Sequence, residues 1–429
     1  MNFYILTLGC KVNQYESEAM LEMMTNSGFE KAESAADADI VIINSCTVTS
    51  TSDKKLRQTI SKIKRENIDC ILVLTGCMPQ AFPKEAESYD NVDILLGNSN
   101  RSELVSCIMK YLSSKQKIVN IKEYTDNSAF ERININNFNG RTRAFVKIED
   151  GCNRFCSYCI IPYARGRVRS KPLDEIIEEI ENLKNKGYKE IVLVGINLSA
   201  YGQDIGLEFF DAVKAACSVD GIDRVRLGSM EPDKLNFDII KKLSKLDKLC
   251  PQFHLSLQSG CDDTLKRMNR HYKSHEYYEI VKNLRENFEN ASITTDIMVG
   301  FPGESEEEFN ESLEFVKKVQ FAKAHIFSYS RRGGTKAYLY KDQISENIKN
   351  IRNKEMAKVT LKSREAFLQS QVGVECYVLF ENIQERNCYF GYTKNYTPVV
   401  VKSIEDICGK ILKVKIEKAY KEVCQGVII

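Results

Sequence analysis

The sequence predicts an α/β protein with three domains: an amino-terminal Rossmann-like parallel sheet, a partial (β/α)6 barrel and a small carboxyl-terminal all-β barrel. The chain of 429 residues is longer than one hydrophobic core normally supports. Two series of short apolar runs alternate with helical patterns, and the last stretch contains strand patterns alone. The predicted divisions are 1–114 for the first domain, 115–138 for a polar linker, 139–368 for the second domain and 369–429 for the third.

The composition is that of an ordinary soluble protein, with 43% hydrophobic and 28% charged residues. No apolar run approaches the roughly 20 residues of a membrane span, and the first residues lack the basic segment of a secretory signal. We therefore expect a cytoplasmic protein with no membrane partner. The formal net charge of +2 excludes a strongly basic nucleic-acid binder, and no DNA partner is expected, but a local patch that contacts phosphates is compatible with it.

The first domain contains four strand-like runs, which are β-branched and almost continuously apolar. Such runs, separated by helical patterns, are typical of a parallel sheet that is covered on both faces. They lie at 3–10, 40–46, 71–77 and 92–97. The second domain repeats the alternation six times, which predicts an open or partial barrel whose chemistry lies at the carboxyl ends of its strands. Its strands are expected at 143–150, 190–197, 224–229, 253–258, 293–300 and 324–330.

The third domain follows a charged helix, which is expected from about 344 to 371, and consists of five strand patterns. A compact barrel is the natural interpretation, and small barrels of this type often bind oligonucleotides. Residues 367–429 carry eight Lys and Arg against seven Asp and Glu, so charge gives RNA binding little support. A plain adaptor and an RNA-binding module therefore both fit.

Three cysteines lie close together in "GCNRFCSYCIIPYARG" (151–166), just after the first strand of the second domain. Cys152, Cys156 and Cys159 put three soft thiolates on one loop. A 4Fe-4S cluster takes four ligands, so three cysteines leave one iron open. Zinc is the alternative, but it needs a fourth Cys or His, and the first histidine of the chain, His254, is distant in sequence. The chain has fifteen cysteines and no secretory signal, which argues against a disulfide framework.

A CxxxCxxC loop after the first strand of a six-unit βα series resembles the radical S-adenosylmethionine superfamily. The resemblance implies that S-adenosylmethionine chelates the open iron through its amino and carboxylate groups. One electron from the cluster then cleaves the cofactor to methionine and a 5′-deoxyadenosyl radical. Tyr158, just before Cys159, matches the position that the family places near the adenine; a packed loop aromatic is the alternative.

Further cofactor contacts are expected where polar groups follow the strands of the second domain, because a bound cofactor lies at those strand ends. The candidates are Gly195, Asn197, Glu231, Gln258 and Asp296. The "GFPGES" stretch that follows Asp296 also contains a capping box, so it serves equally well as the start of a helix.

A second trio of cysteines closes three strands of the first domain. Cys10, Cys46 and Cys77 are far apart in sequence, but the carboxyl ends of parallel strands meet at one edge, so a second metal site there is physically reasonable. Cys70 lies seven residues before Cys77, roughly 23 Å away along an extended strand at ~3.3 Å per residue, and should not be a ligand. The other eight cysteines have no partner spacing and are expected to be plain buried thiols: Cys107, Cys217, Cys250, Cys261, Cys376, Cys388, Cys408 and Cys424.

Both trios and their neighbours resemble the methylthiotransferases of the radical superfamily. The motifs are "LGCKVNQYESE", "NSCTVTSTSDKK", "TGCMPQ", "CNRFCSYCIIPYARGRVRS" and "LSLQSGCDDTLKRMNR", and the similarity, including a terminal barrel like the TRAM domain, covers the whole chain. The resemblance implies a second 4Fe-4S cluster on Cys10, Cys46 and Cys77 that carries a sulfur atom. It also implies two uses of S-adenosylmethionine, as methyl donor and as radical source, and an electron donor such as flavodoxin or ferredoxin.

The motif "TLGCKVNQYESE" resembles the type that acts on N6-threonylcarbamoyladenosine beside the tRNA anticodon. The resemblance implies methylthiolation of C2 to give 2-methylthio-N6-threonylcarbamoyladenosine, with that tRNA as partner. Arg331 and Arg332 are candidate substrate residues, because a threonylcarbamoyl group carries a carboxylate that arginine grips well. A role in phosphate contacts, or simple exposure to solvent, would explain these two arginines equally well.

Three other functions stay open. Relatives within the family act on isopentenyladenosine in tRNA or on an aspartate of a ribosomal protein, and a non-catalytic iron-sulfur RNA-binding protein would need no S-adenosylmethionine. Contacts with the RNA backbone are expected from the barrel and from the arginines near the cysteine loop. The candidates are Lys394, Lys402, Lys410, Lys413, Lys415, Arg141, Arg143, Arg165, Arg167 and Arg169.

Overall fold

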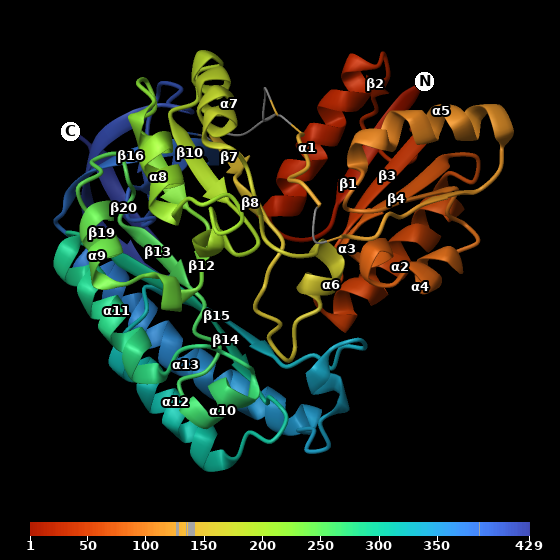
Figure 1. Ribbon diagram of the computed structural model, residues 1–429. Coiled ribbons are helices and arrows are strands. Elements are labelled where there is room, and N and C mark those ends of the chain that lie inside the picture. Colours follow the sequence, from red (N-terminus) through yellow and green to blue (C-terminus); the bar gives the residue numbers. More distant parts are fainter. Residues whose placement is uncertain (126–127, 134, 136–141, 386) are drawn as a thin grey trace.

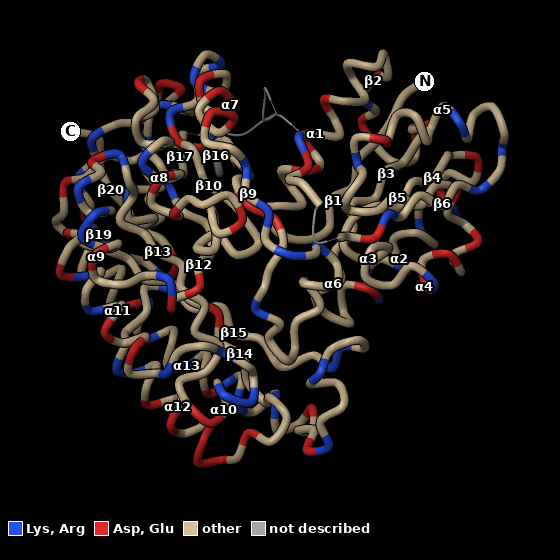
Figure 2. Tube along the Cα trace, in the orientation of Figure 1, with Lys and Arg blue, Asp and Glu red and all other residues tan. Residues whose placement is uncertain are grey.

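The computed structural model describes residues 1–125, 128–133, 135, 142–385 and 387–429. Figure 1 shows two lobes, with the amino-terminal sheet in one lobe and the second and third domains in the other. Lys and Arg are interspersed with Asp and Glu over both lobes (Figure 2), as expected for a net charge of +2. Among the described residues, no helix is both long enough and apolar enough to cross a membrane.

The amino-terminal sheet is parallel throughout, with strand order β2-β1-β3-β4-β5-β6. Alternate residues of β3 point to opposite faces: Ile40 and Ile42 pack toward α1 and α5, and Val41 and Ile43 pack toward α2. The four predicted strands and the cover on both faces are confirmed. The main elements are β1 (Asn2–Thr7), α1 (Lys11–Asn26), β2 (Glu30–Lys31), β3 (Ile40–Ser45), α2 (Ser50–Glu66), β4 (Ile71–Gly76), α3 (Cys77–Ala81), α4 (Pro83–Glu87), β5 (Ile94–Leu96), α5 (Leu104–Ser114) and β6 (Ile118–Asn120).

The segment 115–138 is not a free linker where the structure describes it. The strand β6 pairs in parallel with β5 and extends the sheet past the predicted boundary at residue 114. Farther on, Ile133 and Ile135 are buried in the core of the second domain. A strand of three residues has too little apolar pattern to be recognised among polar neighbours, which explains why the sequence predicted a linker here.

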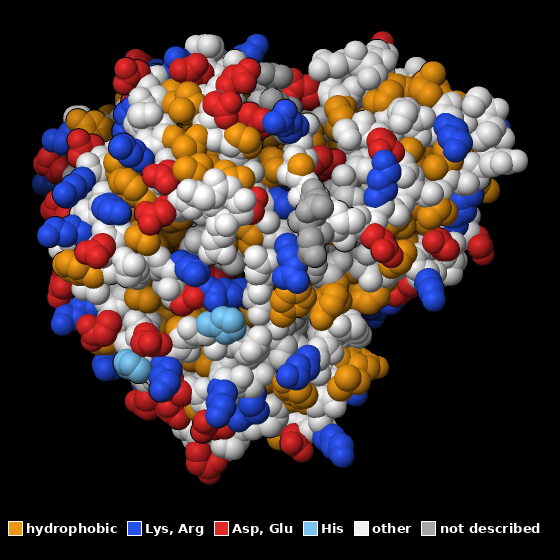
Figure 3. Space-filling view, viewed as in Figure 1, with side chains coloured by type: hydrophobic (Ala, Val, Ile, Leu, Met, Phe, Trp, Pro, Cys, Tyr) orange, Lys and Arg blue, Asp and Glu red, His pale blue; other side chains and the backbone are white. Residues whose placement is uncertain are grey.

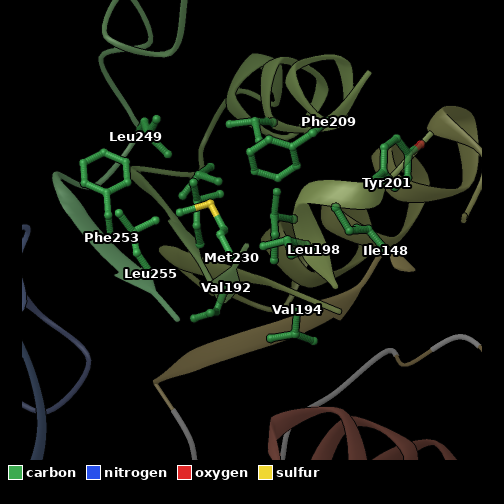
Figure 4. Packing of buried hydrophobic residues seen from close by; sticks show 14 of the residues in the cluster. Ile148, Val192, Val194, Leu198, Tyr201, Phe209, Met230, Leu249, Phe253 and Leu255 are labelled. Atoms are coloured by element: carbon green, nitrogen blue, oxygen red, sulfur yellow. The ribbon is translucent and has the colours of Figure 1, made fainter. Parts of the chain in front are cut away.

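The second domain is the predicted partial barrel, with six parallel strand positions and its helices on the outside. The third strand is interrupted at Gly228 into β11 and β12. Figure 4 shows Val192 of β10, Phe253 of β13 and Phe209 of α8 in one apolar core. The elements are β7 (Arg143–Lys147), β8 (Glu149–Asp150), α6 (Ile161–Arg165), β9 (Arg169–Ser170), α7 (Leu173–Asn185), β10 (Glu190–Val194), α8 (Phe209–Ser218), β11 (Arg224–Leu227), β12 (Ser229–Met230), α9 (Phe237–Leu243), β13 (Gln252–Leu255), α10 (Asp262–Arg267), α11 (Ser274–Asn287), β14 (Ser292–Val299), α12 (Glu306–Val319) and β15 (Lys323–Ser328).

The third domain is a closed barrel in the order β16-β17-β18-β20-β19, which confirms the five predicted strands. It is connected to the second domain by the predicted charged helix, α13 (Glu346–Ser370). The barrel covers the amino-terminal ends of β7, β10 and β11: Arg224 donates to the Tyr377 carbonyl at 2.8 Å, and Arg226 donates to the Lys394 carbonyl at 2.9 Å. Its strands are β16 (Glu375–Glu385), β17 (Cys388–Thr393), β18 (Pro398–Lys402), β19 (Ile411–Tyr420) and β20 (Val423–Ile428).

Glu190 pairs with the arginines at the contact between the barrel and the second domain. Its buried carboxylate lies 2.8 Å from Arg226 Nε, 3.5 Å from Arg224 Nη1 and 3.7 Å from Arg143 Nη1. Burial alone would raise the pKa of Glu190, but these arginines, Arg226 foremost, outweigh it and hold the pKa below its ordinary value.

Replacement of Glu190 by Gln should lower the free energy of unfolding by about 3 kcal/mol, because buried arginines lose their counter-charge. Urea denaturation of the full chain measures the loss. Glu178→Gln makes the same chemical change at an exposed position of α7 and should cost almost nothing. Equal stability of the two variants would contradict the role given to Glu190.

Candidate active site

The cysteine loop, residues 151–160, is held by backbone hydrogen bonds at both ends. The Cys152 N–H donates to the Gly166 carbonyl at 3.0 Å, and the Ser157 N–H donates to the Met268 carbonyl at 3.0 Å. Gly151 has a φ of +87°, and a Cβ there would lie 1.9 Å from the Arg167 carbonyl oxygen, so only glycine allows the loop to leave the strand. These contacts determine the path of the loop.

The three thiols of this loop lie within electrostatic reach of one another. Burial, with the neighbouring Glu149, Cys156 and Glu231 charges, raises the pKa of Cys152 to about 12. Burial and the neighbouring thiols Cys156 and Cys152 likewise raise the pKa of Cys159 above its ordinary value. Crowded, poorly solvated thiols are stabilised as thiolates by a cationic iron centre, which is the chemistry of a cluster ligand set.

No group of three or more His, Cys, Asp or Glu side chains in the described part of the chain is placed to hold a single metal ion. An iron-sulfur cluster differs from a single ion, because each thiolate binds its own iron and the ligands stand farther apart.

Arg270, to which the sequence had assigned no role, is the main cation beside the cysteine loop. Its Nη1 lies 3.5 Å from Cys156 Sγ and 3.5 Å from the Tyr158 hydroxyl. Its Nη2 pairs with the Glu231 carboxylate at 2.6 Å. Arg270 thus orients Tyr158 of the loop and Glu231 beside it, and their role as cofactor contacts stays a prediction. Its only signal in the sequence was its place in the quoted "LSLQSGCDDTLKRMNR" motif.

Asn197 lies beside Cys152, and Gly195 lies against the neighbouring Glu149. The Asn197 amide Nδ2 is 3.7 Å from Cys152 Sγ, and the Asn197 N–H donates to the Glu149 carboxylate at 2.7 Å. A Cβ at Gly195 would lie 2.7 Å from that same carboxylate, so glycine allows the approach. Burial raises the pKa of Glu149 well above its ordinary value. Glu149 therefore connects both residues to the cysteine loop, and their role as cofactor contacts stays a prediction.

Gln258 and Asp296 differ in their availability to a cofactor. Gln258 is buried in a left-handed conformation with a φ of +65°, and its Oε1 has no hydrogen-bond partner among the residues that the structure describes. A buried acceptor without a partner is what a bound cofactor with N–H or O–H groups would satisfy. The Asp296 carboxylate is 3.2 Å from His254 Nε2, so a cofactor contact through Asp296 would have to share that carboxylate.

The trio of the first domain gathers at the carboxyl edge of the sheet. Cys10 caps α1, Cys46 follows β3 and Cys77 begins α3, directly after β4. Burial and the charges of Cys77 and Cys10 raise the pKa of Cys46 to about 12, so the three thiols influence one another as those of the cysteine loop do. Cys70 precedes β4, at the other end of that strand from Cys77.

Arg165 links Cys77 of the first trio to Asp150, which lies two residues before Cys152. It belongs to a set of buried charges that we call the ionic junction: Glu16, Arg101, Lys147, Asp150 and Arg165. Arg165 Nη1 lies 2.7 Å from Glu16 of the first domain and 3.0 Å from Asp150 of the second. Its Nε donates to Cys77 Sγ at 3.3 Å. The three cations outnumber the two carboxylates, and none of the five side chains is more than 3% exposed. An anionic, thiolate-bound cluster at Cys77 would balance the excess positive charge.

Glu16 is the acceptor that most members of the junction share. It lies 3.0 Å from Arg101 Nη2 and 3.1 Å from Lys147 Nζ, in addition to Arg165. Burial would raise its pKa, but the cations, Arg101 first, lower it to about 2. The carboxylate therefore stays ionised at neutral pH.

The two candidate substrate arginines have different surroundings. Arg332 is buried, pairs with Asp53, donates to Thr47 and stacks over the Phe82 ring at 4.4 Å, so it ties the second domain to the first and is not available to a substrate. The prediction for Arg332 is corrected accordingly. Arg331 is exposed; its Nε donates to the Tyr338 carbonyl at 3.1 Å, and its guanidinium lies 4.5 Å from the Tyr338 ring centroid.

The arginines expected to dock RNA are mostly engaged inside the protein. Arg143 and Arg165 pair with the buried carboxylates Glu190 and Glu16, and Arg169 donates to two carbonyls at 2.8 Å. Arg167 is exposed, whereas Arg141 lies outside the described residues. Among the lysines of the barrel, Lys402, Lys410 and Lys415 are exposed without a described partner; Lys413 pairs with Glu375 and Lys394 donates to the Asp247 carbonyl.

Replacement of Arg165 by Met should lower the free energy of unfolding by about 3 kcal/mol, because Glu16 and Asp150 lose a buried partner. Urea denaturation of the full apoprotein measures it, with Arg57→Met at an exposed ion pair as the control. The double variant with Glu16→Gln should lose clearly less than the sum of the two single losses. Additive losses would show that the two side chains are not coupled.

Comparison with known families agrees with this geometry. The Radical SAM superfamily model matches residues 146–316, and the model of the uncharacterized protein family UPF0004 matches residues 2–97. The chain is 38% identical over 422 residues to the threonylcarbamoyladenosine tRNA methylthiotransferase MtaB of Bacillus subtilis, which covers 96% of this chain and 93% of that protein. It is 37% identical over 435 residues to the tRNA-2-methylthio-N(6)-dimethylallyladenosine synthase of Clostridium tetani, covering 99% and 95%.

Solved structures confirm the fold. The radical S-adenosylmethionine methyltransferase TsrM of Kitasatospora setae aligns with a TM-score of 0.55 and 14% identity, over 76% of this chain and 73% of that one. Identity that low supports the architecture and nothing finer. The extent and identity of the match to the curated relatives are decisive: the chain belongs to the radical S-adenosylmethionine methylthiotransferase family and is an enzyme of the transferase class.

Proposed function

We propose that the enzyme methylthiolates C2 of N6-threonylcarbamoyladenosine next to the anticodon of tRNA. The observation that carries the proposal is the pair of cysteine trios, one in each domain, joined through Arg165 in a chain whose full length matches relatives of that name. Two ligand sets with three cysteines each match two tasks, sulfur delivery and radical formation. The non-catalytic alternative is dropped, because the chain belongs to an enzyme family.

When bound, two 4Fe-4S clusters and two molecules of S-adenosylmethionine would supply the sulfur, the methyl group and the radical that removes hydrogen from C2. Cys152, Cys156 and Cys159 would hold the cluster that binds S-adenosylmethionine. Cys10, Cys46 and Cys77 would hold the cluster that carries sulfur. An electron donor such as flavodoxin or ferredoxin in the cytoplasm would reduce them.

The protein's own side chains have positioning tasks in this reaction. Arg270 holds Glu231 and Tyr158 at the cysteine loop, and the buried Gln258 Oε1 would accept a hydrogen bond from a bound cofactor. The ionic junction keeps the two cysteine sets in one orientation. Exclusion of water from this junction strengthens its ion pairs.

The substrate assignment rests on Arg331 and on the relatives. A carboxylate distinguishes threonylcarbamoyladenosine from dimethylallyladenosine, and the exposed Arg331 guanidinium is suited to bind it. Dimethylallyladenosine in tRNA is the second candidate, because relatives named for it are up to 37% identical to this chain. The relatives from Bacillus subtilis and Clostridium tetani are named for tRNA nucleosides, which gives no support to an aspartate of a ribosomal protein as the substrate.

Deletion of the gene should abolish 2-methylthio-N6-threonylcarbamoyladenosine in tRNA, measured by nucleoside mass spectrometry, and the wild-type gene should restore it. Arg331→Gln should restore less, because the substrate carboxylate loses its cation, whereas Arg57→Gln at an exposed ion pair should restore all of it. Disappearance of 2-methylthio-dimethylallyladenosine instead would establish the second candidate. Unchanged levels of both nucleosides would refute a tRNA substrate.

Combined replacement of Cys10, Cys46 and Cys77 by Ala should remove about four irons per chain and leave cofactor cleavage to 5′-deoxyadenosine intact, because the other trio is in a separate domain. Iron analysis and chromatography of the reconstituted protein measure both quantities. Cys70→Ala is the matched control, since this thiol lies at the opposite end of β4, and it should keep all of the iron. Methylthiolation by the triple variant would exclude the second cluster from the reaction.

A further inference from the structure

A groove of about 520 Å³ lies between the edge of the amino-terminal sheet and the outer side of the cysteine loop. Figure 3 shows hydrophobic side chains gathered near the centre of this face, where the two lobes meet, with Lys and Arg beside them. We call it the aromatic groove. Its lining includes Glu87, Glu123, Phe155, Tyr163 and Arg167.

Two aromatic rings in this groove are exposed. Phe155 is 40% exposed and Tyr163 is 54% exposed, and their rings meet edge to face with centroids 5.9 Å apart. The Arg167 guanidinium lies 5.8 Å from the Phe155 ring centroid. Exposed aromatic rings beside a planar cation are what proteins use to stack unpaired bases.

The backbone of Phe155 adopts an unfavourable conformation. Phe155 lies between Cys152 and Cys156 on the cysteine loop. Its φ of +50° is a left-handed conformation that bulky residues rarely adopt. Asn269 Nδ2 donates to the Phe155 carbonyl at 3.1 Å and helps to hold that conformation. A strained backbone that keeps a ring partly exposed is typical of functional sites, so the ring has a role beyond packing.

The charges of the groove indicate which part of a nucleotide it would take. Glu87 and Glu123 are exposed, and their carboxylates would repel a run of phosphates. The same carboxylates accept hydrogen bonds from the amino and imino groups of bases. A neutral, planar base stacked on an aromatic ring, with its backbone toward Arg167, therefore fits better than a phosphate chain.

We propose that the aromatic groove stacks an unpaired base of the RNA loop that flanks the target adenosine. The inference rests on the proposed tRNA substrate. Phe155 belongs to the loop that would hold S-adenosylmethionine, so a strand that delivers its adenosine to this site places its neighbouring bases near the groove. The groove thereby contributes to RNA affinity without touching the reacting atoms.

The test uses the reconstituted full-length enzyme and an anticodon stem-loop RNA that carries 2-aminopurine next to the target adenosine. Wild-type enzyme should bind this RNA and quench the 2-aminopurine fluorescence. Tyr163→Leu should raise Kd about tenfold and lose the quenching, as expected for the loss of one base stack. Tyr163→Phe should restore both, and Phe237→Leu, at a 50% exposed aromatic on α9, should change neither.

Iron content and cleavage of S-adenosylmethionine without RNA show that Tyr163→Leu is intact. An intact Tyr163→Leu variant with wild-type Kd and quenching would overturn the groove while leaving the proposed function standing. Slower reduction by flavodoxin with an unchanged Kd for RNA would also overturn it, because the groove would then dock a protein reductant. Wild-type enzyme that binds no RNA would refute the proposed function and the groove together.

Discussion

The buried pairing of Arg165 with Glu16 and Asp150 is the interaction on which the rest of the site depends. It joins a carboxylate of the first domain to one of the second, and the same guanidinium donates to Cys77. Buried charges are costly unless every member is paired, so the two domains can meet in few other ways. The contact of Arg332 with Asp53 adds a second ionic link between the domains. The relative orientation of the two cysteine trios thus follows from buried electrostatics.

The two cysteine trios share one feature of their surroundings, which is an arginine beside one of the three thiols. In each trio one thiol receives a buried arginine N–H, from Arg165 to Cys77 and from Arg270 to Cys156. A hydrogen bond to a cluster thiolate, together with burial, sets how easily that cluster accepts an electron. Arg270 also holds Glu231, whereas Arg165 belongs to a charge network, so the two sites are equipped differently.

Much of the architecture could be predicted from the sequence, because strands and helices depend on local patterns of apolar residues. Apolar runs gave the strands, and the strand ends brought Cys10, Cys46 and Cys77 to one edge. The short strand β6 has no such pattern. The arginines were harder still: Arg165, Arg270 and Arg332 owe their roles to partners that lie far from them in the chain. An arginine beside a motif looks the same in sequence whether it faces solvent, a phosphate or a buried carboxylate.

In the proposed reaction, the cluster on Cys152, Cys156 and Cys159 would form the radical that acts on C2 of threonylcarbamoyladenosine, and the cluster on Cys10, Cys46 and Cys77 would deliver the sulfur. The most direct test supplies the reconstituted enzyme with a tRNA stem-loop whose threonylcarbamoyladenosine carries deuterium at C2. Mass spectrometry should find one deuterium in 5′-deoxyadenosine and a methylthio group in place of the deuterium in the RNA. Formation of 5′-deoxyadenosine without deuterium, or an RNA that keeps its deuterium, would contradict the account.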